Sequence, residues 1–289
     1  MKVGFLGPRA TFTNLAVQKM FPATNNSIPY ETIPECMDAV MSGEIDIATV
    51  PLENALEGSV NITLDYLIHE VDIPIRAEIT TPIAQHLMVH PENKNKVIEK
   101  IYSHSHAIAQ CHKQLHQHWK GIQCENMTST AAAAQFVMLH PEQPIAAIAN
   151  ELAAKEYNLE IVARDIHDFS HNHTRFVILS KQELEFSKTK GKFNGNKTTV
   201  MVTLPEDQSG ALHLVLSAFA WRKLNLTKIE SRPMKTGLGN YFFIIDIDKD
   251  MDDVLIPGAI AELEALGSKV KVLGSYPSYK IEKGTVNEE

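Results

Sequence analysis

The chain has 289 residues, of which 44% are hydrophobic and 21% charged, and its formal net charge is −8. This composition is typical of a soluble globular protein of one or two domains, and the acidic balance without a basic cluster argues against nucleic-acid binding. No apolar run reaches the roughly 18 residues of a membrane span, the N-terminus lacks a signal-peptide pattern, and the three scattered cysteines suit a reducing compartment. We therefore expect a cytoplasmic protein without membrane or nucleic-acid partners.

The first part of the chain alternates strands and helices. We expect strands over 2–6 and 44–50, and helices over 12–21, 33–42 and 60–69. Thr11 or Thr13 is suited to cap the first helix, because a threonine hydroxyl accepts a hydrogen bond from a free backbone N–H. Glu53 and Asn54 follow the second strand and precede a helix, which is where open α/β sheets bind ligands. The same position also suits a solvated capping loop.

Two strand-like runs within residues 71–90 lead into a second part with the same alternation. There we expect strands over 101–103, 122–125 and 145–149, and helices over 108–119 and 151–157. A further alanine-rich helix is expected to begin at a Ser129-Thr130 cap. Strands over 161–164 and 174–179 then return to the first part. Alternating strands and helices imply mainly parallel sheets with right-handed crossovers. The sequence thus predicts two α/β lobes with a cleft between them.

The segment Thr174-Arg175-Phe176 puts a hydroxyl, a cation and an aromatic ring on consecutive residues at the start of the returning strand. Neighbouring side chains of a strand face opposite ways, so Thr174 and Phe176 share one side and Arg175 takes the other. Twist or a bend at the strand end would be needed to bring all three around one small anionic ligand. On the pattern alone, an ordinary edge strand with a polar entry turn is favoured.

The histidines and glycines do not indicate a metal or nucleotide site. His112 and His116 have the i,i+4 spacing of a helical metal pair, but no third acidic or cysteine ligand follows at a typical spacing. A solvated helix face explains the histidine-rich segment 104–118 better. Gly4 and Gly7 have neither the spacing nor the third glycine of a dinucleotide-binding loop. We expect neither a metal nor a cofactor.

The pattern changes after residue 180. Residues 181–197 are polar, charged and glycine-containing, as in a linker. Residues 198–277 then predict the order β-α-β-β-α-β of ferredoxin-like domains, with a turn at Gly237 and Gly239, and residues 278–289 form a tail. Such a unit has an open sheet face and exposed edges, so we expect it to pair with another copy as a homodimer or homotetramer.

Five short motifs occur in order along the chain, namely Gly7-Pro8-Arg9-Ala10-Thr11-Phe12, Val50-Pro51-Leu52-Glu53-Asn54 with Gly58-Ser59-Val60, Asn172-His173-Thr174-Arg175-Phe176, Gly210-Ala211-Leu212 and Glu230-Ser231-Arg232-Pro233. On these motifs, residues 1–180 resemble the catalytic domain of prephenate dehydratase, and residues 198–277 resemble its regulatory ACT domain. The resemblance thus covers nearly the whole chain. Ala10 and Ala55 depart from the family pattern, which often has glycine and serine there.

The resemblance implies a catalytic domain with two lobes like those of periplasmic binding proteins, and the conversion of prephenate into phenylpyruvate, CO2 and water without a cofactor. Thr174 would donate a hydrogen bond to the departing hydroxyl, Arg175 would pair with a substrate carboxylate, and Phe176 would wall the ring. The further candidates for lining the substrate site are Thr11, Glu53, Asn54, Asn172, Ser129 and Thr130.

The resemblance also implies feedback inhibition by L-phenylalanine in a pocket between paired ACT domains. The residues that match its motifs are Gly210, Ala211, Leu212, Glu230, Ser231, Arg232 and Pro233. A glycine at a helix start permits close backbone approach, and the free N–H groups there favour a carboxylate. The simpler alternative is an exposed strand pair, Glu230 and Arg232, on a purely dimerising domain.

The sequence is also compatible with two other functions. Arogenate, the amino analogue of prephenate, is an alternative substrate, which would make the chain an arogenate dehydratase. A non-catalytic two-lobed amino-acid sensor is an alternative of another class, although the missing export signal and the intact Thr174-Arg175-Phe176 argue against it. Because no mutase-like helical segment precedes Lys2, we expect a monofunctional enzyme.

Overall fold

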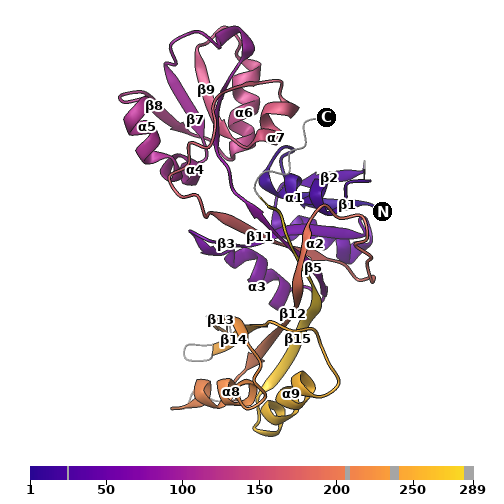
Figure 1. Ribbon diagram of the computed structural model, residues 1–289. Coiled ribbons are helices and arrows are strands. Elements are labelled where there is room, and N and C mark those ends of the chain that lie inside the picture. The colour runs from indigo at the N-terminus through magenta and orange to yellow at the C-terminus, as the bar shows by residue number, and fades with distance from the viewer. Residues whose placement is uncertain (25, 206–208, 235–240, 283–289) are drawn as a thin grey trace.

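The computed structural model describes residues 1–24, 26–205, 209–234 and 241–282. Three parts follow one another along an elongated molecule (Figure 1). Lobe 1 comprises residues 3–82 and 173–179, lobe 2 comprises residues 86–163, and the second domain comprises residues 192–280. Lobe 1 lies between the other two and contacts both. The predicted Gly237–Gly239 turn and the end of the predicted tail, 283–289, lie outside the described residues.

Lobe 1 begins with the expected alternation of strands and helices. Its first elements are β1 (Val3–Leu6), α1 (Phe12–Met20), β2 (Ser27–Tyr30), α2 (Ile33–Ser42), β3 (Ile47–Asn54), β4 (Gly58–Ser59) and α3 (Asn61–His69). At the start of α2, Thr32 Oγ1 accepts from the Glu35 N–H and the Glu35 carboxylate accepts from the Thr32 N–H. This reciprocal cap, with Gly43 in the left-handed region at the other end, fixes the helix bounds.

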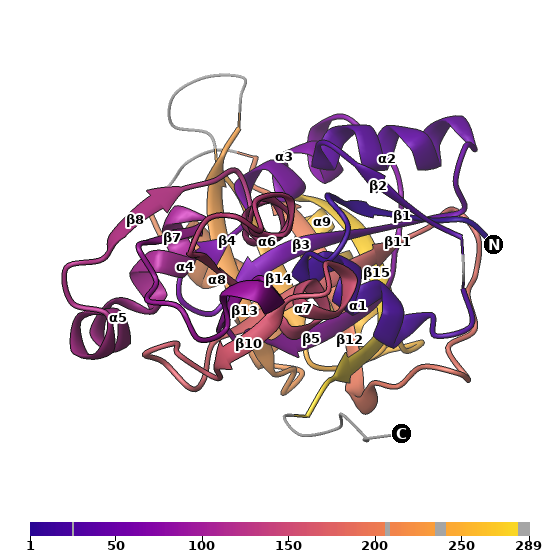
Figure 2. The same ribbon diagram turned by 90° about the horizontal axis from the view of Figure 1, so that it is seen from above.

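The returning strand β11 (His173–Leu179) pairs with β3 and with β5 (Ile75–Pro82) in the middle of lobe 1. An apolar core lies on each face of this sheet, one under α2 and α3 and the other under α1, and these helices lie on opposite sides of β1 and β3 when viewed from above (Figure 2). Val177 belongs to the first core and Phe176 to the second. The alternation of strand side chains therefore separates Arg175 from Thr174 and Phe176.

Lobe 2 repeats this architecture. Its elements are β6 (His86–Val89), a 3-10 turn η1 (Pro91–Asn93), β7 (Lys100–Ser103), α4 (Ser105–Gln110), α5 (His112–His118), β8 (Gln123–Asn126), α6 (Thr130–Leu139), β9 (Ile145–Ala149), α7 (Glu151–Glu156) and β10 (Glu160–Ala163). The single helix expected over 108–119 is two helices, because the backbone leaves helical geometry at Cys111 (φ −109°, ψ 9°). Ser129 caps α6, as predicted.

The sheets of both lobes are mixed rather than mainly parallel. The alternating segments give the parallel pairs β1–β2, β1–β3, β7–β8 and β7–β9. The strands that cross between the lobes run the other way: β11 is antiparallel to β3 and β5, and β6 is antiparallel to β9 and β10. The two crossings therefore supply the antiparallel pairs that a simple β-α alternation does not predict.

The second domain has the predicted element order. Its elements are β12 (Lys192–Thr203), α8 (Ala211–Ala220), β13 (Leu226–Pro233), β14 (Tyr241–Ile247), α9 (Leu255–Ala265) and β15 (Lys269–Lys280). The strand order is β13-β14-β12-β15 and neighbouring strands are antiparallel. Val200, Val215 and Ile256 form part of a core between the sheet and its two helices. This is the ferredoxin-like arrangement expected from the pattern.

The expected linker and tail are wrong at their bounds. β12 begins at Lys192, inside the predicted linker 181–197, and β15 continues to Lys280, inside the predicted tail 278–289. The last residues of β15 pair in parallel with β5, with Ser278 opposite Glu78. The hydrophilic side chains of these residues led to the prediction of a linker and a tail. Their backbone N–H and C=O groups are instead hydrogen-bonded in strand pairs. Within the described ranges, lobe 1 and the second domain thus share one ten-stranded sheet.

The junction between lobe 1 and the second domain also has an apolar core. Phe242 of β14 and Leu273 of β15 belong to the same buried cluster as Leu64 and Leu67 of α3. The His69 ring meets the Phe242 ring edge-on, with centroids 5.7 Å apart. A continuous sheet and a shared core leave the second domain firmly attached to the lobe that carries Thr174.

Candidate active site

A cavity of about 1130 Å³ lies between the two lobes. Its walls come from the ends of β1 and β3, the starts of α1, α4 and α6, and the start of β11. Six of the nine residues predicted to form the substrate site line it, namely Thr174, Phe176, Thr11, Asn54, Ser129 and Thr130. The structure thus brings together residues that are far apart in the chain.

Thr174 is the centre of the polar wall. Asn54 Nδ2 donates a hydrogen bond to Thr174 Oγ1 at 2.9 Å, and the two residues are opposite each other in the β3–β11 pairing. Asn54 Oδ1 accepts from the N–H groups of Leu56 and Glu57, which fixes the orientation of the amide. Because Oγ1 already accepts from Asn54, the threonine proton is left to donate into the cavity.

Apolar side chains form the wall beside Thr174. Phe176 is fully buried and lines the cavity, together with Leu6, Phe12 and Val60. Thr174 and Phe176 are two residues apart on one strand and therefore face the same side. The hydroxyl of Thr174 and the ring of Phe176 therefore both lie at the cavity.

Arg175 is not brought to the cavity. Its guanidinium lies on the opposite side of β11, enclosed by Glu78, Asp246 and Tyr276. Burial disfavours the charge, but Tyr276, Asp246 and Glu78 outweigh it and raise the pKa of Arg175 above its ordinary value. The expected pairing of Arg175 with a substrate carboxylate is therefore not supported. The twist of β11 does not turn the Arg175 side chain to the cavity side, where Thr174 and Phe176 lie.

Glu53 and Asn172 are also outside the lining. Glu53 faces Lys228 of the second domain at 3.2 Å instead of the cavity. Asn172 is buried, and its Nδ2 donates to Gln110 Oε1 at 3.1 Å. Because Gln110 lines the cavity, Asn172 supports the site from behind, whereas Glu53 belongs to the domain junction.

Thr11 and Ser129 act as helix caps at the cavity. Thr11 Oγ1 accepts from the Asn14 N–H at 3.3 Å and donates to the Leu6 carbonyl at 3.2 Å. Ser129 Oγ accepts from the Ala132 N–H at 2.9 Å. The Thr11 hydroxyl is engaged as donor and acceptor and the Ser129 hydroxyl as acceptor. The two residues set two helix starts, α1 and α6, against the cavity. Backbone N–H groups at a helix start favour anions.

Several polar lining residues were not predicted as site residues, among them Gln85, His104, His106 and Gln110. Gln85 is 2% exposed, and its Oε1 has no hydrogen-bond partner among the described residues. Burial and the neighbouring His106 lower the pKa of His104, which favours its neutral ring. The sequence held two signals for these residues. Gln85 lies between two apolar strands, and His104 and His106 follow the end of a strand.

Contacts across the cavity hold the lobes together. Glu57 of lobe 1 lies 2.7 Å from His106 Nδ1 and accepts from Gln110 Nε2 at 3.1 Å, both on α4 of lobe 2. At the other side, Asn150 Nδ2 donates to the Ala10 carbonyl at 2.9 Å. Ala10 has a positive φ of 64°, a conformation that favours glycine, which accounts for the glycine common at this position.

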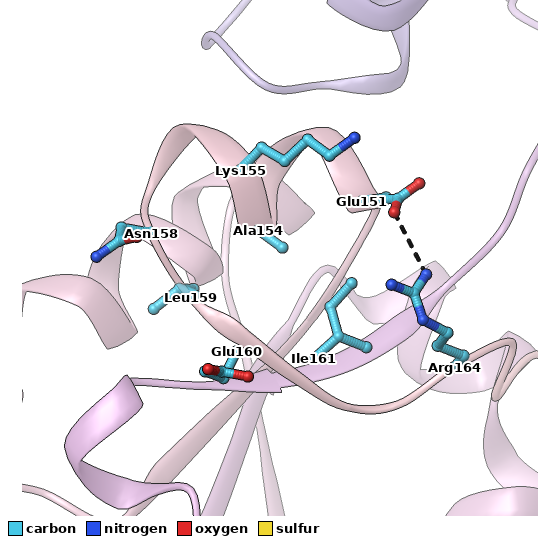
Figure 3. A pocket seen from close by; sticks show the side chains of 8 residues that line it. All are labelled: Glu151, Ala154, Lys155, Asn158, Leu159, Glu160, Ile161 and Arg164. Carbon is cyan, nitrogen blue, oxygen red and sulfur yellow. Dashed lines mark hydrogen bonds and ion pairs between the residues drawn. The ribbon is translucent and has the colours of Figure 1, made fainter. Parts of the chain in front are cut away.

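The described lining residues of this cavity include no lysine or arginine. A smaller hollow of about 360 Å³ lies on lobe 2, where Arg164 pairs with Glu151 at 3.3 Å (Figure 3). None of the predicted site residues reaches it. In the described part of the chain, no group of three histidine, cysteine or acidic side chains is arranged to hold a metal, and no helix is long and apolar enough to span a membrane.

The predicted effector residues divide between two faces of the second domain. Gly210 precedes α8 with φ 86°, and no side chain caps that helix. Glu230 accepts from Ser59 Oγ at 2.5 Å, and Arg232 donates to Asn61 and Asp65, so both face lobe 1. The Ser59 and Lys228 hydrogen bonds outweigh burial and lower the pKa of Glu230.

The remaining effector candidates lie elsewhere. Ser231 and Pro233 are exposed and point away from lobe 1. Ala211 is buried and Leu212 is partly exposed at the start of α8.

Comparison with known proteins assigns the family. Residues 3–184 match the family model "PDT: Prephenate dehydratase". The chain is 62% identical to the prephenate dehydratase of Bacillus subtilis over 285 residues, covering 97% of this chain and 100% of that protein. It is also similar, with a TM-score of 0.82 and 36% identity over 96% of this chain and 90% of the other, to a prephenate dehydratase of Arthrobacter aurescens solved in complex with L-Phe.

The fold alone does not specify the reaction. A structure described as a quorum-quenching acylase, GqqA, has a TM-score of 0.81 and 25% identity, covering 96% of this chain and 98% of its own. The much higher identity to a prephenate dehydratase and the family model over residues 3–184 decide between them. On both grounds, the chain belongs to the prephenate dehydratase family.

Proposed function

We propose that this chain converts prephenate into phenylpyruvate, CO2 and water in the cavity between its lobes, with Thr174 as the group that assists departure of the ring hydroxyl. The observation that carries the proposal is the Asn54–Thr174 hydrogen bond, which presents the threonine proton to the cavity. The test is formation of phenylpyruvate from prephenate by the purified protein.

The reaction requires little from the protein besides orientation and one hydrogen bond. The bond to the ring carboxylate breaks, its electron pair completes the aromatic ring, and the C–O bond to the hydroxyl breaks. Thr174 donates a hydrogen bond to the leaving oxygen as it gains negative charge, and the departing hydroxide takes up a proton from solvent to leave as water. Asn54 donates to Thr174 Oγ1 and so stabilises the partial negative charge that the donation leaves there. Aromatisation supplies the driving force, so no electron-accepting cofactor is invoked.

The lining supports recognition of the two substrate carboxylates without a permanent cation. The starts of α1 and α6 offer backbone N–H groups for the pyruvyl carboxylate. The leaving carboxylate is better placed against Phe176 and Leu6, where weak solvation disfavours its charge and favours loss of CO2. A fixed cation at that position would stabilise the ground state and oppose decarboxylation.

Gln85 is proposed to complete the substrate site by donating a hydrogen bond from its amide Nε2 to a substrate carboxylate. We expect Gln85→Leu to raise KM for prephenate by about tenfold, because a hydrogen bond to a charged group contributes roughly 1.5–3 kcal/mol. The same change should leave the melting temperature unchanged or higher, since the buried Oε1 has no partner to lose. Steady-state kinetics and thermal unfolding measure the two effects. An unaltered KM would exclude Gln85 from the substrate site.

Prephenate is favoured over arogenate and over a binding-only role. The curated relative with 62% identity acts on prephenate by its description. The ratio of kcat/KM for the two substrates decides between prephenate and arogenate, with a higher value expected for prephenate. Binding of prephenate without turnover would instead support a two-lobed sensor.

The second domain is proposed to be an ACT domain that binds L-phenylalanine and inhibits the enzyme, by analogy with the L-Phe complex of the Arthrobacter relative. β13 is an edge strand, and Ile229 and Ser231 lie on its exposed side, opposite the side facing lobe 1. An open edge with an exposed apolar residue suits pairing with a second copy, as a homodimer or homotetramer in the cytoplasm. Gly210, Ala211, Leu212, Ser231 and Pro233 remain the effector candidates.

Gly210→Ala tests this effector site. We expect it to weaken inhibition by L-phenylalanine at least fivefold, the lower range of typical allosteric coupling, with turnover of prephenate retained. Gly267→Ala is the matched control, because Gly267 also has a positive φ (89°) at a helix end of the same domain and its added Cβ meets only ordinary contacts. Equal effects of the two substitutions on inhibition would show that L-phenylalanine does not bind at the start of α8.

A further inference from the structure

The guanidinium of Arg175 is held from two domains. Its Nε donates to Glu78 Oε2 at 2.5 Å, one terminal nitrogen donates to Asp246 Oδ2 at 2.5 Å, and the other donates to the Tyr276 hydroxyl at 3.0 Å. Glu78 belongs to β5 of lobe 1, whereas Asp246 and Tyr276 belong to β14 and β15 of the second domain. The residue is only 8% exposed, so these contacts form most of the surroundings of the guanidinium.

The charges around Arg175 are balanced within the junction. Lys197 Nζ lies 2.7 Å from Glu78 Oε1, and Thr199 Oγ1 donates to Asp246 Oδ1 at 2.7 Å. Both oxygens of Glu78 and of Asp246 are therefore engaged, and Arg175 and Lys197 lie against these carboxylates. The Arg175 guanidinium is therefore not available to bind a substrate carboxylate, because moving it away from its partners would leave buried carboxylates without a compensating charge.

This junction lies directly behind the catalytic hydrogen bond. In the β3–β11 pairing, Thr174 is opposite Asn54 and Arg175 is opposite Glu53. Each strand thus turns one side chain to the cavity and the next to the second domain. Glu53 Oε2 lies 3.6 Å from Arg175 and 3.2 Å from Lys228 of β13. The pair behind Asn54 and Thr174 is therefore held by residues of the second domain.

We propose that Arg175 is a positioning residue through which the second domain sets the geometry of Thr174 and transmits the effector state to the cavity, an inference that rests on the proposed function. Asp246 and Lys228 hold Arg175 and Glu53. A displacement of β13 or β14 relative to lobe 1 moves this pair and, through one peptide unit on each strand, the Thr174–Asn54 hydrogen bond. A displacement of about 1 Å is enough to lower a rate substantially.

Asp246→Asn in the full-length protein is the primary test, because Asp246 does not line the cavity. We expect kcat per folded enzyme to fall about tenfold, KM for prephenate to change less than twofold, and maximal inhibition by L-phenylalanine to shrink. Asp248→Asn is the matched control: it makes the same charge change just beyond β14, at an exposed position. The folded fraction at the assay temperature is measured by circular dichroism, so that loss of folded protein is not counted as loss of kcat.

Thr199→Val provides a second variant if Asp246→Asn does not fold, because it removes the Thr199 hydrogen bonds to Asp246 and Tyr276 without changing a charge. The same shift in kcat and in the response to L-phenylalanine, in smaller degree, supports the proposal. An unchanged kcat, a change confined to KM, or an unchanged response to L-phenylalanine overturns it. A wild-type protein without turnover of prephenate would contradict the proposed function instead, before any variant is compared.

Discussion

Thr174→Val is expected to lower kcat for prephenate at least about 100-fold, because it removes the one hydroxyl donor that Asn54 orients toward the cavity. Valine has nearly the shape of threonine, so the apolar wall with Phe176 stays intact. KM should change little, since the hydrogen bond strengthens as charge develops on the leaving oxygen in the transition state. Steady-state formation of phenylpyruvate measures both constants.

Thr81→Val is the matched control for Thr174→Val. Thr81 is opposite Thr174 in the β5–β11 pairing and is also buried, but it does not line the cavity and its Oγ1 has no partner among the described residues. We expect this variant to keep wild-type kcat and to be as stable as the wild type or more so. A comparable loss of activity in both variants would mean that packing, and not the Thr174 hydroxyl, accounts for the effect.

Glu78→Gln is expected to destabilise the protein by about 3–5 kcal/mol, the usual cost of leaving buried charges without their partner. Glu78 is fully buried and faces both Arg175 and Lys197. Glutamine keeps the shape of the side chain but removes the negative charge, so Arg175 and Lys197 lose the carboxylate that both contact. Chemical denaturation should show a lower midpoint.

Glu183→Gln is the comparison for Glu78→Gln, since Glu183 also pairs with an arginine, Arg76, but its side chain is 86% exposed. Solvent screens such a pair, so its loss should leave the unfolding midpoint close to that of the wild type. Similar midpoints for the two variants would show that the buried cluster does not stabilise the junction.

Much of the fold was predictable from local pattern. Helix α2 is an example, because Thr32, Glu35 and Gly43 specify its ends by short-range hydrogen bonds and backbone conformation. The β-α-β-β-α-β order of the second domain was predictable for the same reason. The pairing of β15 with β5 was not, because polar residues 278–280 carry no local sign that their backbone joins a distant sheet.

The site was predictable where the alternation of side chains along a strand decides which residues face the cavity. Thr174 and Phe176 face the cavity together, as the period of two requires. The family resemblance implied that Arg175 pairs with a substrate carboxylate, but the partners that bind it come from residues 78, 246 and 276, which no spacing connects to it. Gln85 was missed because one glutamine between two strands has no motif.

The most direct test of the account is turnover of prephenate by the purified wild-type protein, without added metal or cofactor, with phenylpyruvate and CO2 both quantified. We expect equimolar phenylpyruvate and CO2, and a much lower rate of their formation by the Thr174→Val variant. Binding of prephenate without formation of either product, or the same rate in the Thr174→Val variant, would contradict it.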